Sequence, residues 1–258
     1  MSFSKAHFCN PAVKEPRPWL TWVLAIAANL TPFSHAEAVD APALQQLLIS
    51  RRCVACDLSD AVLAGANLVG ADLTRADLTG ANLQDSRLSR ARLSQANLQG
   101  ANLNGSFMNG AKLVEANLST VSAIGASLNQ ADMSLVQASE STLTDLEARA
   151  SNWYRSNLEN INLDNAFLVQ SSFTEANLQG ASLQQAEMLG AEFMGADLTD
   201  ANLTGANLSY ALMRDANLTN VDFTDASLQN ANLARSNLEG ATFCNTLMPD
   251  GTINNRDC

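Results

Sequence analysis

A strict five-residue repeat constrains this chain more than any other feature. Residues 61–63 read Ala-Val-Leu, residues 66–68 read Ala-Asn-Leu and residues 71–73 read Ala-Asp-Leu, and this rhythm continues along the chain. A period of five fits neither an α-helix nor a plain strand. Each triplet can form a very short strand whose Ala and Leu point inward and whose middle residue points outward. The repeat therefore predicts a β-solenoid in which neighbouring units bury one another's apolar side chains.

The repeat keeps its phase from Leu58 to Met248, which makes thirty-nine pentapeptides centred on the Leu position. The bulky residues at that position indicate the coil size, because like residues tend to stack in adjacent coils. Five pairs of them are twenty residues apart, whereas one pair is fifteen apart and three are twenty-five apart. Four pentapeptides per coil are therefore favoured, which gives about ten coils. The predicted core column on one face consists of Met133, Trp153, Phe173, Phe193 and Met213.

The tandem A(D/N)Lxx motif over these residues resembles that of the pentapeptide repeat family. The resemblance covers about three quarters of the chain. It implies an all-β fold, a right-handed quadrilateral β-helix, which we expect over residues 56–250. The motif is specific for this fold and says almost nothing about activity.

Residues 1–38 precede the repeat and have the features of a secretory signal peptide. Lys14 and Arg17 come before an apolar run over residues 19–30, and residues 36–38 read Ala-Glu-Ala, a spacing typical of signal peptidase sites. The run is shorter than the roughly twenty residues that span a bilayer. We expect cleavage after this triplet and no stable membrane insertion afterwards, with an uncleaved anchor as the alternative. Cleavage would remove both histidines and change the net charge from −11 to −12.

Residues 39–55 are expected to form an N-terminal capping helix and a linker. Asp40 can cap the helix, Pro42 suits its first turn, and residues 44, 47 and 48 are leucines at helical spacing. An open solenoid end exposes unpaired strand edges, so this helix is interpreted as a plug over residues 40–51. The alternative is an amphipathic helix that binds a partner.

The expected mature chain keeps four cysteines, an even number that favours disulfides in an exported protein. Cys53 and Cys56 occupy inward phases of the first coil and are predicted to form a structural pair. Redox activity of this CxxC motif and two free buried thiols remain alternatives. A zinc site is disfavoured because further Cys or His ligands are not near in the sequence.

The second cysteine pair, Cys244 and Cys258, brackets the end of the chain. Residues 248–251 read as a turn that ends the repeat, and residues 251–258 are predicted to form a tail held back by a disulfide. Closing this loop of 15 residues contributes on the order of 3 kcal/mol in the chain-entropy model. Both cysteine-containing ends resemble those of exported cyanobacterial pentapeptide repeat proteins, which implies the periplasm or the thylakoid lumen.

The repeat is weakest between Val121 and Ile161. Ala123, Ala138 and Ala148 replace the central Leu, and in each unit the usual alanine is enlarged, to Val121, Val136 and Leu146. Close packing would require this exchange of volume within a continuous core. The alternative is that residues 139–155 leave the coil as a loop, which is where scaffolds commonly carry binding sites.

The predicted outward surface is rich in Asn, Asp, Gln, Ser and Thr and is acidic over its last third, with few aromatic residues. One cluster is basic, and together with the outward Tyr154 it is the candidate binding surface. Its basic members are Arg75, Arg87, Arg90, Arg92 and Lys112.

No catalytic constellation is visible, and we expect neither an enzyme nor a cofactor or metal site. The carboxylates are outward and solvated, so shifts of their pKa values are not expected. The favoured function is a rigid exported scaffold, a monomer or weak dimer, that binds an unknown protein partner and no nucleic acid. Some family members mimic DNA and occupy gyrase, which gives one alternative function, although B-DNA carries far more charge per length than this chain. A CxxC redox protein is the second alternative.

Overall fold

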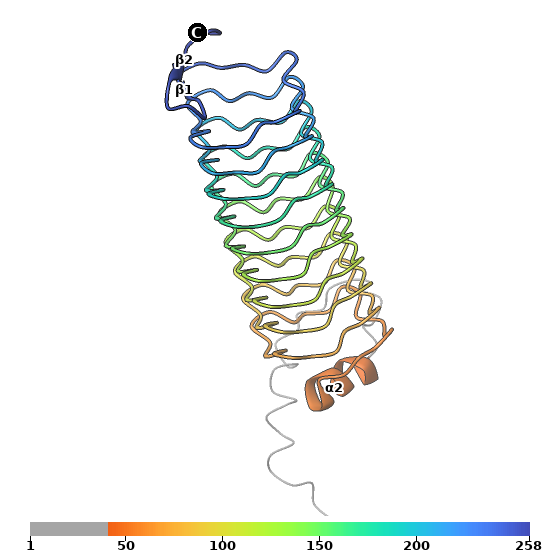
Figure 1. The fold of residues 1–258 in the computed structure, drawn as a ribbon. Helices are drawn as coiled ribbons and strands as arrows, with labels where there is room; N and C mark the ends of the chain where they lie inside the picture. Colours follow the sequence, from red (N-terminus) through yellow and green to blue (C-terminus); the bar gives the residue numbers. More distant parts are fainter. Residues whose placement is uncertain (1–40) are drawn as a thin grey trace, which may run out of the picture. The chain divides into compact units, whose positions relative to one another are not determined.

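The computed structural model describes residues 41–258. The expected signal peptide, residues 1–38, and the expected helix cap Asp40 lie outside the described residues. The described chain begins with helix α2, Ala41–Ser50, continues as a regular coil, and ends with two short antiparallel strands, β1 at Thr246–Leu247 and β2 at Ile253–Asn254 (Figure 1).

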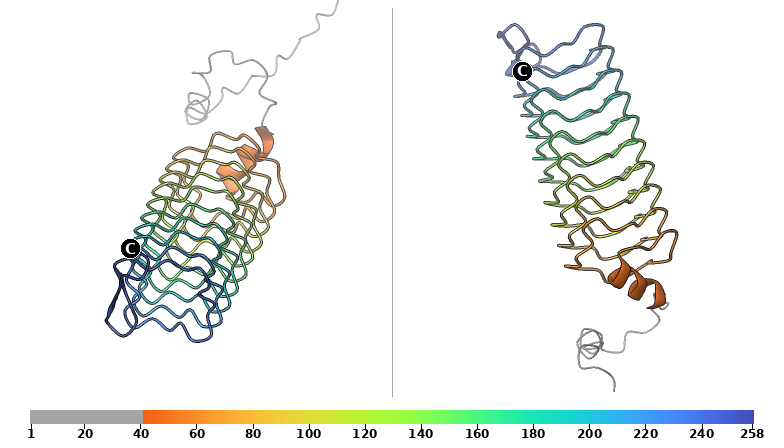
Figure 2. Two further views of the ribbon diagram at one scale, coloured as in Figure 1. Left: turned by 90° about the horizontal axis from the view of Figure 1, so that it is seen from above. Right: turned by 60° about the horizontal axis from the view of Figure 1, so that its bottom comes forward.

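The coil advances by twenty residues per turn, as the spacing of bulky residues predicts. The outward residue of each short strand pairs in parallel with the residue twenty positions further on, from Arg52 with Asp72 to Ser227 with Leu247. Hydrogen bonds follow the same spacing: the Asp77 N–H donates to the Cys56 carbonyl at 2.9 Å. The predicted fold class, a right-handed quadrilateral β-helix, is confirmed (Figure 2).

Each coil has four faces, which we name A to D after the outward residues of the first coil. Face A begins with Arg52, face B with Asp57, face C with Val62 and face D with Asn67, and residues at intervals of twenty share a face. A surface position can therefore be assigned from its residue number alone.

A left-handed backbone residue closes almost every pentapeptide. Glycine occupies this corner at Gly65 and Gly80, with φ near +66°, but Thr120, Leu135 and Tyr210 adopt similar values of +57°, +61° and +62°. Such values strain residues with a Cβ atom. The stacked hydrogen bonds on both sides of each corner hold it in place, so the coil dictates the conformation here.

The inward positions form one continuous apolar core. The core column lies fully buried on face A, where the rings of Trp153 and Phe173 stack at 5.8 Å between centroids and those of Phe173 and Phe193 at 5.0 Å. Met133 and Met213 continue the column on either side. Helix α2 adds Ala43 and Leu47, both buried, to the core cluster, as expected of a plug.

The weak coils remain part of the helix, so residues 139–155 do not leave it as a loop. Parallel pairing continues without interruption, and the exchanged residues, such as Val136 and Ala138, are buried. Buried serines assist the turns here. The Ser141 hydroxyl donates to the Leu118 carbonyl at 2.6 Å, and the Trp153 Nε1–H donates to the Ser151 hydroxyl at 2.7 Å.

Candidate functional site

The five predicted basic residues lie around face A and its two corners. Arg92 and Lys112 are adjacent outward residues of face A. Arg90 lies at the corner between faces D and A, Arg75 at the corner between faces A and B, and Arg87 on face D. The coil thus gathers five cations from 38 residues of sequence. We call this set the basic surface.

The charges of the basic surface are mostly unneutralised. Within the described residues, Arg92 is the one member with a carboxylate oxygen within 4.0 Å, since its Nη1 lies 3.9 Å from Asp72 Oδ2. The Arg92 side chain is 68% exposed, so this contact is well solvated and contributes little to stability. The basic surface is therefore electrostatically available to an anionic partner on a chain whose net charge is −11.

Tyr154 lies on face A, two coils beyond Lys112, and points outward half-buried. The Arg155 guanidinium lies 5.0 Å from the centre of its ring, and Arg155 Nε donates to Glu175 at 2.6 Å. The structure therefore places the predicted tyrosine on the same face as Arg92 and Lys112, beside an ion pair that holds Arg155 in position.

A shallow hollow lies beside the basic surface on face D. It is lined by Arg87, Ser89, Phe107 and Asn109, and the Phe107 side chain is half exposed. The hollow therefore combines a cation with an exposed aromatic ring.

Several outward aspartates have lowered pKa values, contrary to the expectation from the sequence. The Asp72 carboxylate accepts the Thr74 hydroxyl at 2.7 Å, and this hydrogen bond lowers the pKa of Asp72 against a smaller effect of burial. At Asp197 burial raises the pKa, but hydrogen bonds from Thr199 and two amide side chains outweigh it and the pKa is lowered. The expectation was wrong at Asp72 and Asp197 because the Thr two residues later donates two local hydrogen bonds to each carboxylate, from its hydroxyl and from its backbone N–H.

The four cysteines form two pairs, one at each end of the coil. Cys53 is buried and Cys56 is partly buried, with a Cα–Cα distance of 5.5 Å, and the structure joins them by a disulfide. Cys244 and Cys258 are joined in the same way at a Cα–Cα distance of 4.8 Å. These distances suit disulfide geometry.

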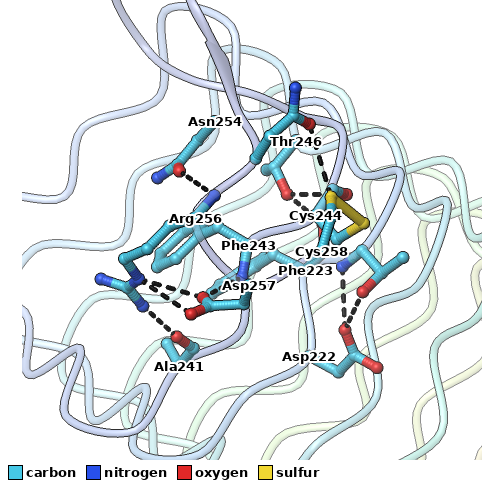
Figure 3. A network of polar contacts seen from close by, with 12 residues as sticks. Asp222, Phe223, Ala241, Phe243, Cys244, Thr246, Asn254, Arg256, Asp257 and Cys258 are labelled. Carbon is cyan, nitrogen blue, oxygen red and sulfur yellow. Dashed lines mark hydrogen bonds and ion pairs between the residues drawn. A yellow bond between two sulfur atoms is a disulfide. The ribbon is translucent and has the colours of Figure 1, made fainter.

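The C-terminal tail folds back over the last strand of face C (Figure 3). The Phe243 N–H donates to Asp257 Oδ2 at 2.9 Å, and the Asp257 N–H donates to the Phe243 carbonyl at 3.1 Å. The first of these bonds lowers the pKa of Asp257. Slight burial acts in the opposite direction, and the hydrogen bond and charge of Arg256 lower the pKa further. The Arg256 guanidinium lies 5.0 Å from the Phe243 ring and donates to the Ala241 carbonyl. The tail thereby supplies partners to an otherwise open strand edge.

The described residues hold no cluster of three or more His, Cys, Asp or Glu side chains arranged to bind a metal ion. Across residues 41–258, helices are too short and too polar to cross a membrane.

The sequence analysis missed a set of exposed apolar side chains. They gather on face D and at its corner towards face A, and their exposed fractions lie between 40% and 59%. They are Phe107, Phe167, Leu189 and Tyr210. The signal was present in the sequence, because positions 107 and 167 are outward strand positions of the repeat and carry Phe where most units carry a polar residue.

A family model described as Pentapeptide repeats matches the chain in 8 copies. The matched residues are 56–95, 91–134, 154–188, 171–210 and 211–248. Residues 135–153, which the model leaves unmatched, fall within the weak coils, where the structure nevertheless continues the helix. No curated protein matches the chain.

Solved structures provide three comparisons. HetL from the cyanobacterium Nostoc sp. strain PCC 7120, a pentapeptide repeat protein involved in heterocyst differentiation regulation, is 28% identical over 85% of this chain and 100% of its own, with a TM-score of 0.45. QnrB1, a plasmid-mediated fluoroquinolone resistance protein, is 16% identical over 71% of this chain and 87% of its own, with a TM-score of 0.50. A pentapeptide repeat protein of the Arabidopsis thaliana thylakoid lumen is 33% identical over 32% of this chain and 61% of its own, with a TM-score of 0.21.

Proposed function

Because the chain belongs to the pentapeptide repeat family, we propose that it is a rigid, non-enzymatic scaffold that binds an acidic segment of a protein partner through face A. The observation that carries this proposal is the basic surface, whose mostly unneutralised cations lie on a molecule with a net charge of −11. The core beneath it is continuous, so Arg92 and Lys112 are held at a fixed spacing. A rigid array of this kind binds with little loss of conformational entropy.

The chemistry of the surface favours a carboxylate-rich peptide as the occupant. Arg92 and Lys112 project from stacked strands about 4.8 Å apart. A peptide strand with acidic side chains on alternate positions can place carboxylates near both cations and near Arg90 at the corner. Tyr154, further along the same face, offers an amphipathic contact to the same segment.

Charge reversal tests the proposal. The double variant R92E/K112E replaces two exposed side chains and should keep the fold, because neither contributes to the core. Affinity capture from the exported fraction of the source cell should recover a partner with the native protein and lose it with R92E/K112E. The matched control is R214E/R235E, which makes two basic-to-acidic changes towards the other end of the coil, outside the basic surface. Equal recovery with all three proteins would reject face A as the binding site.

Export to the periplasm or the thylakoid lumen is part of the proposal. It is supported by the features of residues 1–38 and by the two disulfides, which persist in oxidising compartments. N-terminal sequencing of the protein from fractionated cells should give a mature chain that starts at Val39. A chain that keeps its first 38 residues in the cytoplasmic fraction would reject export.

The basic surface also bears on the rival functions. A DNA mimic needs a dense negative surface along its length, and the cations of the first coils interrupt it. Binding of an acidic protein is therefore preferred to mimicry. A structural role for Cys53 and Cys56 is preferred to redox chemistry because Cys53 is 1% exposed and belongs to the core cluster.

A further inference from the structure

Face D carries a pattern of charges and rings that is complementary to itself. Along its outward column the order is Arg87, Phe107, Ser127, Glu147, Phe167 and Glu187, at intervals of one coil. A cation stands at one end, an anion at the other, and an exposed aromatic ring lies next to each. We propose that two copies of this chain pack face to face through face D, antiparallel about a two-fold axis.

The pairing follows from the register. A two-fold axis across the face reverses the coil direction but keeps each column opposite the same column of the second copy. When Phe107 faces Phe167 of the second copy, Arg87 faces Glu187 and Ser127 faces Glu147, because all three pairs share one midpoint in the sequence. Each contact occurs twice, so the dimer gains two ion pairs and two aromatic pairs.

Other arrangements lack this match. Parallel packing about a two-fold axis places Arg87 against Arg87 and Glu147 against Glu147, and like charges at close range repel. An antiparallel shift by one coil in one direction again opposes the two copies of Glu147. A shift in the other direction places Phe107 against Glu147. One register alone pairs opposite charges and aromatic rings together.

Shape at the corner between faces D and A supports the same register. In this column Tyr210 faces Gly70 of the second copy, Arg90 faces Gly190 and Gln170 faces Gly110. Tyr210 is 59% exposed, and Gly70 has no heavy atom near the position that a Cβ would occupy, so open space lies opposite the large side chain. Large residues therefore meet glycines along this edge.

The side chains involved are accessible and partly preorganised. Phe107 and Phe167 are 50% and 40% exposed, and the Arg149 guanidinium lies 5.3 Å from the centre of the Phe167 ring. Glu187 accepts a hydrogen bond from the Asn207 amide at 2.9 Å, which leaves its other oxygen for a guanidinium. Phe167 and Glu187 are thus held outward before association.

The interface is small, so the dimer is weak. The shared column runs from residue 67 to residue 207, which is seven coil steps. Multiplied by the width of a strand of three residues, this length gives a contact area of roughly 350 Å² on each copy. The total of about 700 Å² is below the roughly 1,200 Å² of stable interfaces. Association is therefore expected at high micromolar concentration and is weakened by salt. Arg92 and Lys112 on face A stay outside this contact, whereas Arg87 and Arg90 of the basic surface lie within it. The inference rests on the contacts of face D, which the charge reversal R92E/K112E leaves unchanged, so the two proposals can fail separately.

Sedimentation equilibrium of the full chain at low salt tests the face D dimer. Protein concentrations from about 10 to about 500 micromolar bracket the expected dissociation constant. R87E should weaken self-association at least about tenfold, because two ion pairs become like-charge contacts. E187R should do the same, and the swap R87E/E187R should restore it. The control R75E makes an equal change outside face D and should leave it unchanged.

Two results would overturn the proposal. The native protein could sediment as a monomer across the whole range, or R87E and R75E could have equal effects with no recovery in the swap. The substituted side chains are all exposed, so each variant is expected to keep the coil. Far-ultraviolet circular dichroism of each variant checks this.

Discussion

The inward and outward positions of the coil differ in what they tolerate. Inward residues pack in columns, and in the column of face A the rings of Trp153, Phe173 and Phe193 stack fully buried. Outward residues on the same strands range from Asn and Asp to Arg and Phe with no change in hydrogen-bond spacing. The inside therefore specifies the scaffold and the outside is free to carry function, which explains why the fold is evident from the sequence and the function is not.

The largest expected effect is at Trp153. Trp153→Ala should reduce the free energy of unfolding by about 3–5 kcal/mol, because a large buried side chain leaves a cavity that stacked coils cannot close. The outward neighbour provides the control: Tyr154→Ala should cost less than about 1 kcal/mol. Urea denaturation followed by circular dichroism measures both. Similar costs at the two positions would contradict the division between inside and outside.

The tail tether comes next in size. Cys258→Ser should lower the free energy of unfolding by about 3 kcal/mol in the chain-entropy model. The destabilisation should be local to the last coils. The disulfide keeps Asp257 and Arg256 within hydrogen-bonding distance of Phe243 and Ala241 at the edge of face C. Hydrogen exchange at Phe243 should rise in the variant, while exchange at Leu98 stays slow. Unchanged protection at Phe243 would mean that the hydrogen bonds alone hold the tail.

Removal of a buried serine hydroxyl should stabilise the protein at two positions, in contrast to the two destabilising changes above. The hydroxyl groups of Ser86 and Ser106 are buried without a hydrogen-bond partner in the described structure, at positions where the repeat usually has Ala. Ser86→Ala should stabilise the protein by about 1 kcal/mol, because an unpaired buried hydroxyl is costly. Ser141→Ala, which removes the hydrogen bond to the Leu118 carbonyl, should destabilise it by about the same amount. Thermal unfolding of the two variants compares the signs directly. Equal shifts in one direction would contradict the assigned hydroxyl environments.

The smallest expected effect is the contribution of Asp197 to the loss of stability at acid pH. The pKa of Asp197 is lowered from 3.8 in the folded chain, so its stabilising contribution is complete above the unfolded value and is lost as the pH falls through 3.8 towards the folded pKa. Asp197→Asn keeps an acceptor for the Thr199 hydroxyl and removes the titration. Between pH 6 and pH 3 the variant should therefore lose less stability than the native protein. Parallel pH profiles from urea denaturation would reject this role.

The five-residue period predicted the coil and the burial of Trp153 and Phe173, because inward packing repeats with the sequence. The twenty-residue turn followed from the spacing of the bulky residues at the Leu position. The exchange of volume at Val136 and Ala138 predicted correctly that the weak coils remain in the helix. The hydroxyl bonds of Ser141 could not be predicted, because they depend on which carbonyl lies one coil away.

The sequence predicted which residues make up the basic surface, but it did not predict the exposed aromatic residues next to it. The sequence identified the basic cluster, and the coil of twenty residues makes Arg92 and Lys112 stacked cations because they are twenty residues apart. Arg87 and Phe107 are also twenty residues apart and lie side by side on face D, and Phe167 lies three coils further along the same column. The spacing places these residues in one column, but it does not determine how far each side chain is exposed, because exposure depends on the neighbouring side chains.

Site-specific photocrosslinking tests the central claim most directly. A photoreactive amino acid at Val114, the outward neighbour of Lys112 on face A, should give an adduct with a protein partner in the exported compartment, and the adduct should vanish in the R92E/K112E background. The same probe at Ala234, on face A in the last coil, should give none. Adducts of equal yield at both positions, or adducts that survive the charge reversal, would contradict a partner site at the basic surface.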